Sequence, residues 1–394
     1  METREVFVVS AARTAVGSFG GSLKDVPLAD LATTAVRAAL ERSTLEPAAI
    51  EHVVLGNVVP TEPRDAYLGR VAAIQAGIPK ETPAFNVNRL CGSGLQAIVS
   101  AAQMIRLGEA HAAIGGGAES MSRGPYLMPS ARWGARLGDA TLVDYMNGIL
   151  HDPFEVIHMG ITAENVAARH GISREMQDAL AVESQRRAAR AIAEGRFEMQ
   201  IVPVTIATRQ GPVEFKTDEH VRAEVTVEKL AKMKPVFKKD GTVTAGNASG
   251  INDGAAALVL ASAERVRSAR LEPLGRLVAY GHAGVEPSHM GIGPVPATRL
   301  ALERAGLKAD QLDVIESNEA FAAQACAVSK ELNFDPAKVN PNGSGISLGH
   351  PVGATGAIIA TKALYELRRI KGRYALATMC IGGGQGIAAV FERT

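Results

Sequence analysis

The chain has 394 residues, with 42 Lys and Arg against 41 Asp and Glu, so its formal net charge is only +1. This balance gives no overall attraction to nucleic acid or to an acidic membrane surface, and any basic site must be local. A single hydrophobic core is rarely enough at this length, so two or more domains are expected. The 40 glycines and the 4% share of aromatic residues predict an aliphatic interior with many close backbone approaches.

The cysteines lie at positions 91, 326 and 380, too far apart for a disulfide framework and without a Cys-x-x-Cys metal or redox spacing. A reducing, cytoplasmic setting is therefore expected. The first residues show no apolar segment followed by a small-residue cleavage site. The weakly polar stretch 374–391 is interrupted by glycines, which predicts two core strands around a turn rather than a membrane span.

The first 120 residues alternate predicted strands and helices. Strands are expected at 6–10, 52–57, 84–87 and 112–115, and helices at 28–43, 68–76 and 95–107. Strands separated by helices predict a mostly parallel sheet that is covered on both faces. The segment 121–246 is richer in charge and proline and includes a long charged helix at 173–194, so we interpret it as an insertion with functional loops. Apolar residues at 255–261 are expected to rejoin the first sheet.

The same plan is repeated in the rest of the chain. Strands are predicted at 274–281, 314–316, 339–340 and 374–380, and helices at 296–305, 320–332 and 357–370. In both halves a glycine-rich helix start is followed by an apolar strand and a triple glycine, at 115–117 and 382–384. We predict a duplicated α/β chain whose two helix starts meet near a pseudo-twofold axis. Its parts would be 1–120 with 247–272, the inserted loop domain 121–246, and 273–394.

Cys91 lies in the run 88–98, where a glycine-rich turn leads into a predicted helix. The partial positive charge of a helix N-terminus favours the thiolate, the nucleophilic form of cysteine. Three other interpretations compete. Cys is among the most buried residue types and is often a core residue. Residues 92–97 fit a dinucleotide fingerprint, which alone is weak. The run also resembles papain-like proteases, but it lacks their second Cys and their aromatic residue.

Three polar residues of the second half supply further chemistry. His350 lies between a glycine and Pro351, just before a helix, and Cys380 lies at a strand end before a run of glycines that exposes backbone N–H groups. Asn318 begins a helix. Considered one at a time, these residues could equally have purely structural roles, as a buried histidine in a turn, a core cysteine and a helix N-cap. Neither a cysteine protease nor a dinucleotide site explains all three together with Cys91.

Four blocks of the sequence, in order, resemble the signature blocks of the thiolases: 88–94, 318–321, 349–351 and 380–386. The resemblance extends over essentially the whole chain, including 245–254, and is greatest to the biosynthetic type, the acetyl-CoA acetyltransferases and broad-specificity β-ketothiolases. It implies a five-layer α-β-α-β-α thiolase fold of two duplicated halves with an inserted loop domain, usually as a homotetramer that is a dimer of dimers. The implied reaction is the reversible ping-pong condensation of acetyl-CoA with a short-chain acyl-CoA.

The resemblance also implies roles for individual residues. Cys91 would be the nucleophile that carries the acyl group, His350 its base, and Cys380 the acid/base at the α-carbon. Asn318 would hold a water that joins His350 in one oxyanion hole, and the N–H groups of Cys91 and Gly382 would form the other. Contacts to the substrate and CoA would come from Leu150, His158, Met159, Arg222, Phe237, Ala245, Ser249, Met290 and Phe321. CoA and acyl-CoA are then substrates, and neither a metal nor a permanently bound cofactor is expected.

Rival functions remain to be weighed. A decarboxylating ketoacyl synthase of the same fold pairs its nucleophile with two histidines, and Cys380 in place of the second argues against it. A thiolase-like lipid-binding protein would typically have lost a catalytic residue, and a dinucleotide oxidoreductase would leave the second-half residues unexplained. The segment 157–160, Ile-His-Met-Gly, is similar to the short-chain type. The acyl chain length, the physiological direction and the pathway stay open, with polyhydroxyalkanoate synthesis, ketone-body use and β-oxidation all compatible.

Overall fold

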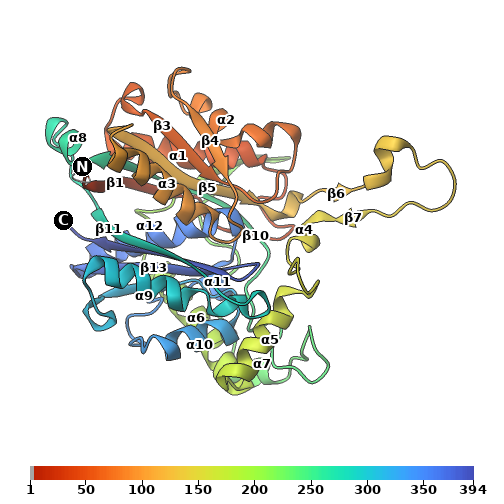
Figure 1. Ribbon diagram of the computed structural model, residues 1–394. Coiled ribbons are helices and arrows are strands. Elements are labelled where there is room, and N and C mark those ends of the chain that lie inside the picture. The colour runs from red at the N-terminus through yellow and green to blue at the C-terminus, as the bar shows by residue number, and fades with distance from the viewer. Residues whose placement is uncertain (1–3) are drawn as a thin grey trace.

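The computed structural model describes residues 4–394, so the expectation about the first residues of the chain lies partly outside it. One ten-stranded sheet runs through the molecule in the order β12-β13-β14-β11-β1-β10-β5-β3-β4, with β2 beside β10 (Figure 1). Its strands are β1 (Val6–Arg13), β2 (Gly17–Ser18), β3 (His52–Gly56), β4 (Ala84–Val87), β5 (Ala112–Ser120), β10 (Asn252–Ser262), β11 (Gly275–Gly284), β12 (Val314–Ser317), β13 (Tyr374–Ile381) and β14 (Gln385–Glu392).

The sheet is mixed, so the prediction of a mostly parallel sheet is wrong. Only β3 with β4, β3 with β5 and β12 with β13 are parallel, and the other neighbours are antiparallel. The turn 382–384 between β13 and β14 is too short for the crossover that parallel strands need. The strand predicted at 339–340 is also wrong, because Val339 makes only an isolated bridge to Ile315. The two core strands predicted within 374–391 are confirmed as β13 and β14.

The strand order repeats between the two halves of the sheet, as the predicted duplication requires. The order β3-β5-β10-β1 has its counterpart in β12-β13-β14-β11, with the same sequence of parallel and antiparallel pairs. The halves join edge to edge where β1 pairs with β11 at Phe7 and Val8. The long segment 121–251 lies between β5 and β10, where the second half has only the turn 382–384.

Helices cover both half-sheets and also separate them. The outer layers hold α1 (Leu28–Ser43) and α2 (Leu68–Gln75) on one side and α9 (Pro294–Ala305) and α10 (Ala322–Glu331) on the other, while α3 (Ser93–Leu107) and α12 (Val352–Ile370) lie in the middle. The five layers are therefore α-β-α-β-α, as predicted. Strand β10 is buried on both faces: Leu258 packs in the middle core and Val259 in the outer core. Both faces are buried because each half-sheet lies between two helical layers.

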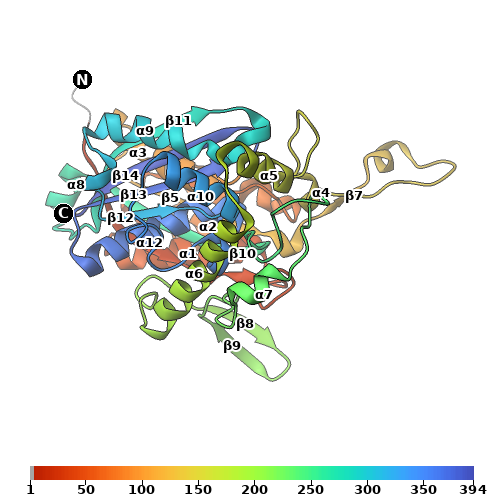
Figure 2. The same ribbon diagram turned by 90° about the horizontal axis from the view of Figure 1, so that it is seen from below.

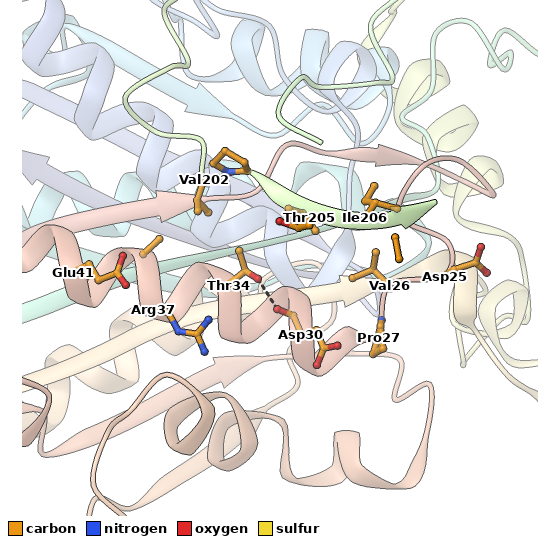
Figure 3. Close-up of a pocket in the computed structure, with 14 residues that line it drawn as sticks. Asp25, Val26, Pro27, Asp30, Thr34, Arg37, Glu41, Val202, Thr205 and Ile206 are labelled. Carbon is orange, nitrogen blue, oxygen red and sulfur yellow. Dashed lines mark hydrogen bonds between the residues drawn. The ribbon is translucent and has the colours of Figure 1, made fainter. Parts of the chain in front are cut away.

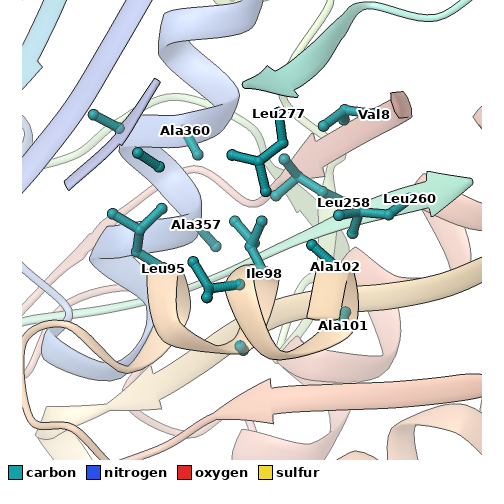
Figure 4. Close-up of a cluster of buried hydrophobic side chains, with 14 of the residues drawn as sticks. Val8, Leu95, Ile98, Ala101, Ala102, Leu258, Leu260, Leu277, Ala357 and Ala360 are labelled. Carbon is teal, nitrogen blue, oxygen red and sulfur yellow. The ribbon is translucent and has the colours of Figure 1, made fainter. Parts of the chain in front are cut away.

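The middle helices pack through glycines at their N-terminal turns. A Cβ on Gly94 of α3 would lie 2.7 Å from the backbone nitrogen of Ala357, and one on Gly356 of α12 would lie 2.3 Å from that of Leu95. The two glycine-rich helix starts therefore meet, as predicted. Figure 4 shows the aliphatic side chains gathered between α3, α12 and the strands beside them. Helix α12 begins at Val352, earlier than predicted, because its first-turn glycines interrupt the apolar pattern.

Strand β5 runs to Ser120, although its triple glycine predicted an end at residue 115. The glycines belong to the strand because neighbouring backbones come close. A Cβ on Gly116 would lie 2.4 Å from the carbonyl oxygen of Ala256, and one on Gly117 would lie 2.1 Å from that of Gly353. The second of these contacts joins β5 to the first turn of α12, so the glycines hold the middle layer close to the sheet.

The segment between β5 and β10 forms a peripheral layer. It contains β6 (Tyr126–Leu127), β7 (Val143–Asp144), α4 (Tyr145–Gly148), α5 (Met159–His170), α6 (Arg174–Ala193), β8 (Val204–Thr208), β9 (Gly211–Phe215) and α7 (Val227–Ala231). The short helices α8 (Ala263–Ser268) and α11 (Gly345–Leu348) lie elsewhere in the chain. The hairpin of β6 and β7 projects far from the body of the molecule (Figures 1 and 2). Within residues 4–394, no helix is long and apolar enough to cross a membrane.

A buried ion pair ties this peripheral layer to β1. Arg13 donates to Asp218 with Nη1–Oδ1 and Nη2–Oδ2 distances of 2.7 and 3.0 Å, and its Nε donates to Oε1 of Gln200 at 3.1 Å. Asp218 also accepts a hydrogen bond from the backbone N–H of Val16 at 2.9 Å. Both charged side chains are fully excluded from solvent. Removing one charge would leave the other buried without a partner.

Asp218→Asn is expected to lower the free energy of unfolding by about 3–5 kcal/mol, because the buried guanidinium loses its counter-charge. The matched control is Asp30→Asn, which breaks the exposed pair of Arg64 and Asp30, 3.3 Å apart and 40% and 52% exposed. That change is expected to cost no more than about 1 kcal/mol. Urea unfolding of both variants beside the unaltered protein measures the difference. Equal losses of unfolding free energy in the two variants would contradict the prediction that the buried ion pair contributes more to stability than the exposed one.

Candidate active site

An apolar cavity of about 400 Å³ lies where the two halves and the peripheral layer meet. Most of the predicted site residues line it: Cys91, Leu150, His158, Met159, Phe237, Ala245, Ser249, Met290, Phe321, His350 and Gly382. They come from distant parts of the sequence, so the fold brings together what the motifs only suggested. The sequence analysis missed several apolar lining residues, among them Val58, Met121, Ile149 and Val352. These carry no chemical signal in the sequence, because they differ from core residues only in their position.

A second cavity, of about 550 Å³, lies at the surface between α1 and β8 (Figure 3). Its lining residues include Asp30, Thr34 and Arg37 of α1 and Thr205 of β8, but neither a cysteine nor a histidine. It therefore contains neither a thiol nor an imidazole, the side chain whose ordinary pKa lies nearest neutral pH. The smaller cavity at Cys91 is therefore the candidate active site.

The turn before α3 holds Cys91 in place. Leu90, directly before it, has a φ of +45°, a conformation that is uncommon for a residue with a side chain. The hydroxyl of Ser93 accepts a hydrogen bond from the N–H of Arg89 at 2.8 Å and donates to the carbonyl of Leu90 at 2.7 Å. A Cβ on Gly92 would lie 2.5 Å from Cδ1 of Ile381. The turn is thus packed against the end of β13, and the thiol stays half-buried at the cavity.

Burial raises the pKa of Cys91 to about 11. The backbone N–H groups of Gly382 and of Cys91 itself donate to the sulfur and lower the pKa, but less strongly, and Glu119 raises it further. The expectation that the helix N-terminus favours a thiolate is therefore wrong for the free protein, because desolvation outweighs it. At neutral pH the group is a thiol. The same two N–H groups were predicted to form an oxyanion hole, and the structure directs both at the sulfur.

Asn318 and Cys380 lie side by side at the ends of two parallel strands. Asn318 follows β12, and its N–H donates to the carbonyl of Thr378 in β13 at 3.0 Å. Cys380 is fully buried in one apolar cluster with Met159, Met290 and Phe321. Burial raises the pKa of Cys380, and the nearby Cys91 raises it further. Neither Asn318 nor Cys380 lines the cavity surface, although both lie directly behind residues that do.

His350 is buried, and burial lowers its pKa to about 4, so the imidazole is neutral at pH 7. Its backbone N–H donates to Oδ1 of Asn252 at 2.9 Å, and Nδ2 of Asn252 donates to the carbonyl of Gly17 at 3.0 Å. Gly349 has a φ of +107°, and a Cβ there would lie 2.5 Å from the amide carbon of Asn252. Asn252 lies in the block 245–254, but the sequence analysis assigned it no role. Only the fold places this block beside His350.

Glu119 is a second residue whose role the sequence analysis missed. It is fully buried, and its carboxyl oxygens accept hydrogen bonds from Nδ2 of Asn57 and the N–H groups of Val58, Val59 and Gly353, at 2.8 to 3.0 Å. Burial raises the pKa of Glu119 to about 8. The carboxyl group joins the turn after β3 to the first turn of α12, just after His350. An acidic residue inside the otherwise apolar and glycine-rich strand β5 was the signal that could have revealed it.

Aromatic rings form part of the cavity wall. Phe237 stacks on His158 with centroids 4.6 Å apart and meets Phe321 edge-on at 6.2 Å. Nδ1 of His158 accepts a hydrogen bond from the N–H of Gly160 at 3.0 Å, which leaves the proton of the neutral ring on Nε2. A Cβ on Gly160 would lie 2.2 Å from the Phe237 ring, so the stack requires glycine there. Arg222 is exposed and lies outside the cavity lining.

No group of three or more His, Cys, Asp or Glu side chains suited to a metal ion occurs within residues 4–394. The chemistry that this arrangement offers is that of two thiols, the imidazoles of His158 and His350 and a set of directed N–H groups. A thiol that is close to a neutral imidazole can attack a carbonyl carbon as the imidazole takes its proton. The arrangement thus fits acyl transfer.

Comparison with known proteins agrees with this geometry. Residues 6–264 match the family model "Thiolase, N-terminal domain", and residues 271–393 match "Thiolase, C-terminal domain". The chain is 66% identical to the β-ketothiolase BktB of Cupriavidus necator, over 99% of this chain and 100% of that protein. It is 50% identical to an acetyl-CoA acetyltransferase of Pseudomonas aeruginosa, with the same coverage.

Solved structures extend the likeness to the fold. Human mitochondrial 3-ketoacyl-CoA thiolase superimposes with a TM-score of 0.98 at 46% identity, over 100% of both chains. An acetyl-CoA acetyltransferase of Bacillus anthracis gives a TM-score of 0.98 at 45% identity, also over 100% of both chains. Sequence and fold agree along the entire length, and we conclude that the chain belongs to the thiolase family.

Proposed function

We propose that this protein is an acetyl-CoA C-acyltransferase of the β-ketothiolase type. It would condense acetyl-CoA with a short-chain acyl-CoA to give a 3-ketoacyl-CoA and free CoA, and cleave 3-ketoacyl-CoA with CoA in the reverse direction. The observation that carries the proposal is that Cys91, His350 and the N–H of Gly382 share one apolar cavity, with Cys380 and Asn318 directly behind them. The names of the relatives, with identities of 50–66% over the whole chain, support the same reaction.

In the first half-reaction, the sulfur of Cys91 attacks the thioester carbon of the first acyl-CoA while His350 takes the thiol proton. The pKa values of about 11 for Cys91 and about 4 for His350 make a complete transfer beforehand costly, on the order of 10 kcal/mol. The proton therefore moves as the carbon–sulfur bond forms. The N–H groups of Cys91 and Gly382 stabilise the developing oxyanion. His350 then returns the proton to the leaving CoA sulfur, which leaves an acyl-Cys91.

In the second half-reaction, the Cys380 thiol passes its proton to the neutral His350, and the resulting thiolate removes a proton from the α-carbon of acetyl-CoA. A thioester α-carbon is a weak acid, and the raised pKa of Cys380 makes its thiolate a correspondingly stronger base. Oδ1 of Asn318 is buried and has no hydrogen-bond partner within residues 4–394, so it is free to hold a water at the enolate oxygen. Each aimed donor contributes roughly 2.7–4 kcal/mol. The carbanion attacks the acyl-Cys91 carbon, and the Cys91 sulfur leaves and takes the proton held by His350. The product is a 3-ketoacyl-CoA, and both thiols and the neutral imidazole are restored.

The peripheral layer is proposed to hold the CoA moiety, which agrees with the division into 1–120 with 247–272, 121–246 and 273–394. Ser249 and Ala245 line the cavity together with Phe237 and Leu150, and His158 and Met159 face the thioester position. Arg222, exposed outside the cavity, would meet the CoA phosphates. A human mitochondrial 3-ketoacyl-CoA thiolase structure that contains CoA has a TM-score of 0.96 with this chain, which supports CoA as the ligand. CoA and acyl-CoA are substrates here, and no permanently bound cofactor is part of the proposal.

We infer a homotetramer, a dimer of dimers, working in the cytoplasm. The projecting hairpin of β6 and β7 supports the assembly, because it exposes large apolar side chains, with Trp133 84% and Leu137 100% accessible. Single chains rarely leave such residues in water unless another surface covers them. The mass in solution, expected at four times the 41.3 kDa of one chain, tests this part of the proposal.

The first test is CoA-dependent cleavage of a series of 3-ketoacyl-CoA substrates of increasing chain length, followed by loss of the enolate absorbance. We expect cleavage of acetoacetyl-CoA and of the five-carbon substrate, with a rate ratio of less than about 200-fold, because one methylene contributes only about 1–3 kcal/mol of discrimination. Cleavage confined to acetoacetyl-CoA would identify a dedicated acetyl-CoA acetyltransferase. No cleavage of any member would refute the proposed activity and favour a binding protein.

Cys91→Ala is expected to abolish both acyl transfer and thiolysis, because no other group can carry the acyl chain. Cys380→Ser should still form the acyl-enzyme but exchange the α-protons of acetyl-CoA at least 100-fold more slowly, roughly the contribution of one general base. Trapping of radiolabelled acyl-enzyme and deuterium exchange measure the two steps separately. Normal α-proton exchange in Cys380→Ser would overturn the role assigned to Cys380.

The raised pKa of Cys91 predicts how its alkylation depends on pH. Below a pKa of about 11 the thiolate fraction grows tenfold per pH unit, so reaction with iodoacetamide should accelerate steadily between pH 7 and 10. The rate is measured by mass spectrometry of the Cys91 peptide, with Cys91→Ala as the background for Cys326 and Cys380. A plateau reached by pH 8 would instead indicate a preformed thiolate.

A further inference from the structure

Three buried hydrogen-bonding contacts run in series through the imidazole of His350. Nδ2 of Asn318 lies 3.4 Å from Nε2 of His350. On the other side of the ring, Nδ1 lies 2.7 Å from Oγ1 of Thr355, and this hydroxyl donates to the carbonyl of Pro351 at 2.9 Å. Thr355 is 2% exposed and Asn318 is fully buried, so water does not compete for these contacts.

The two ends of this series fix its direction. The carbonyl of Pro351 can only accept a hydrogen bond, and the amide nitrogen of Asn318 can only donate one. A threonine hydroxyl has a single proton, and when that proton goes to Pro351, Oγ1 offers only lone pairs to the ring. Nδ1 of His350 must then carry the proton of the neutral imidazole, and Nε2 is left as the acceptor. Both ends require the same arrangement.

We propose that Thr355 is a positioning residue that holds neutral His350 in the tautomer with the proton on Nδ1. Its hydroxyl is locked to the carbonyl of Pro351 and acts as a permanent acceptor for the ring. This inference rests on the proposed function, in which Nε2 of His350 takes the proton of Cys91. The other neutral tautomer has its proton on Nε2 and cannot act as that base.

Every proton in the first half-reaction is then accounted for, and Thr355 does not have to move. Nε2 takes the proton of Cys91 as the carbon–sulfur bond forms, and the ring becomes an imidazolium with a proton on each nitrogen. The Nδ1 proton stays on the hydroxyl of Thr355, while the new Nε2 proton can be donated to the substrate side. When Nε2 gives its proton to the leaving CoA sulfur, the ring returns to the tautomer from which it started. The hydroxyl therefore need not rotate during the cycle.

Helix α12 contains a matched control for this residue. Thr361 is also fully buried, and its hydroxyl donates to the carbonyl of Ala357, four residues before it, at 2.8 Å. The Thr355 hydroxyl donates in the same way to the carbonyl of Pro351, four residues before it, and such hydrogen bonds are common for threonine in helices. The difference is that the Thr355 hydroxyl also contacts a histidine ring, whereas within residues 4–394 the Thr361 hydroxyl bonds only to the carbonyl of Ala357. The effect of losing a buried helical hydroxyl can thus be separated from the effect on His350.

The kinetic test compares Thr355→Val, Thr355→Ser and Thr361→Val in acetoacetyl-CoA thiolysis. Thr355→Val is expected to lower kcat on the order of 10²–10⁴-fold, with KM changed far less, because the ring loses its acceptor and its base tautomer. Thr355→Ser keeps the hydroxyl and should stay within about tenfold of the unaltered enzyme, below the contribution of a general base. Thr361→Val should show no loss comparable to that of Thr355→Val. Equal losses in Thr355→Val and Thr361→Val would overturn the proposal in favour of a structural role.

Two further measurements separate this inference from the proposed function. Nitrogen-15 NMR of histidine-labelled protein, with His350→Asn to assign the signal, shows which ring nitrogen carries the proton and does not depend on turnover. We expect the proton on Nδ1 in the unaltered protein and in Thr355→Ser, and a larger share of it on Nε2 in Thr355→Val; a proton on Nε2 in the unaltered protein overturns the inference.

A double-mutant comparison gives the second measurement. Adding Thr355→Val to His350→Asn should cause no further loss of activity, because the residue acts through the ring. A further loss of the same size as in the unaltered background would mean that Thr355 acts independently of His350. If His350→Asn alone were fully active, the base assignment of the proposed function would fail, while the NMR result would still decide the tautomer.

Discussion

The active site depends on one packing constraint, the contact of α3 with α12 through their first turns. Cys91 precedes the first of these helices and His350 precedes the second. The backbones come so close that a Cβ on Gly94 or Gly356 would overlap the other helix. Both catalytic candidates lie at the ends of rigid elements that meet, so their relative position is fixed by the core. Neither helix could shift without opening the middle layer of the molecule.

Burial controls the chemistry of the groups gathered there. It raises the pKa of the Cys91 thiol and lowers the pKa of His350, so both groups rest in their neutral forms. Cys91 and His350 therefore carry no charge in the cavity before substrate binds. The low dielectric also strengthens the hydrogen bond from each donor that is directed at a charge developing later. The N–H groups of Cys91 and Gly382 are directed at the Cys91 sulfur, and the peptide backbone holds them in place.

Buried polar side chains of the surrounding shell maintain this arrangement. Glu119 ties the first turn of α12 to the end of β3, Asn252 holds the backbone of His350, and Thr355 contacts its ring. Each lies within the core and is satisfied by several hydrogen bonds, which is the condition under which polar groups are tolerated there. The position of His350 is therefore set by a network that draws on both halves of the chain.

The sequence by itself determined most of the local elements and the family, and it predicted which residues react. The helix 28–43 and the strand 84–87 follow directly from apolar periodicity, and the thiolase signature blocks around Cys91 and His350 identified the family. Only the tertiary structure decided the direction of the strands. Strand β10 pairs with β1 and β5, which lie far from it in the sequence, and β14 runs antiparallel to β13 because the turn between them is short. It also decided the pKa of Cys91: the helix N-terminus predicted a thiolate, whereas desolvation by residues from other segments produces a thiol. Asn252, Glu119 and Thr355 were hidden for the same reason, since their roles consist of contacts across long sequence distances or across a helix turn, which no local pattern records.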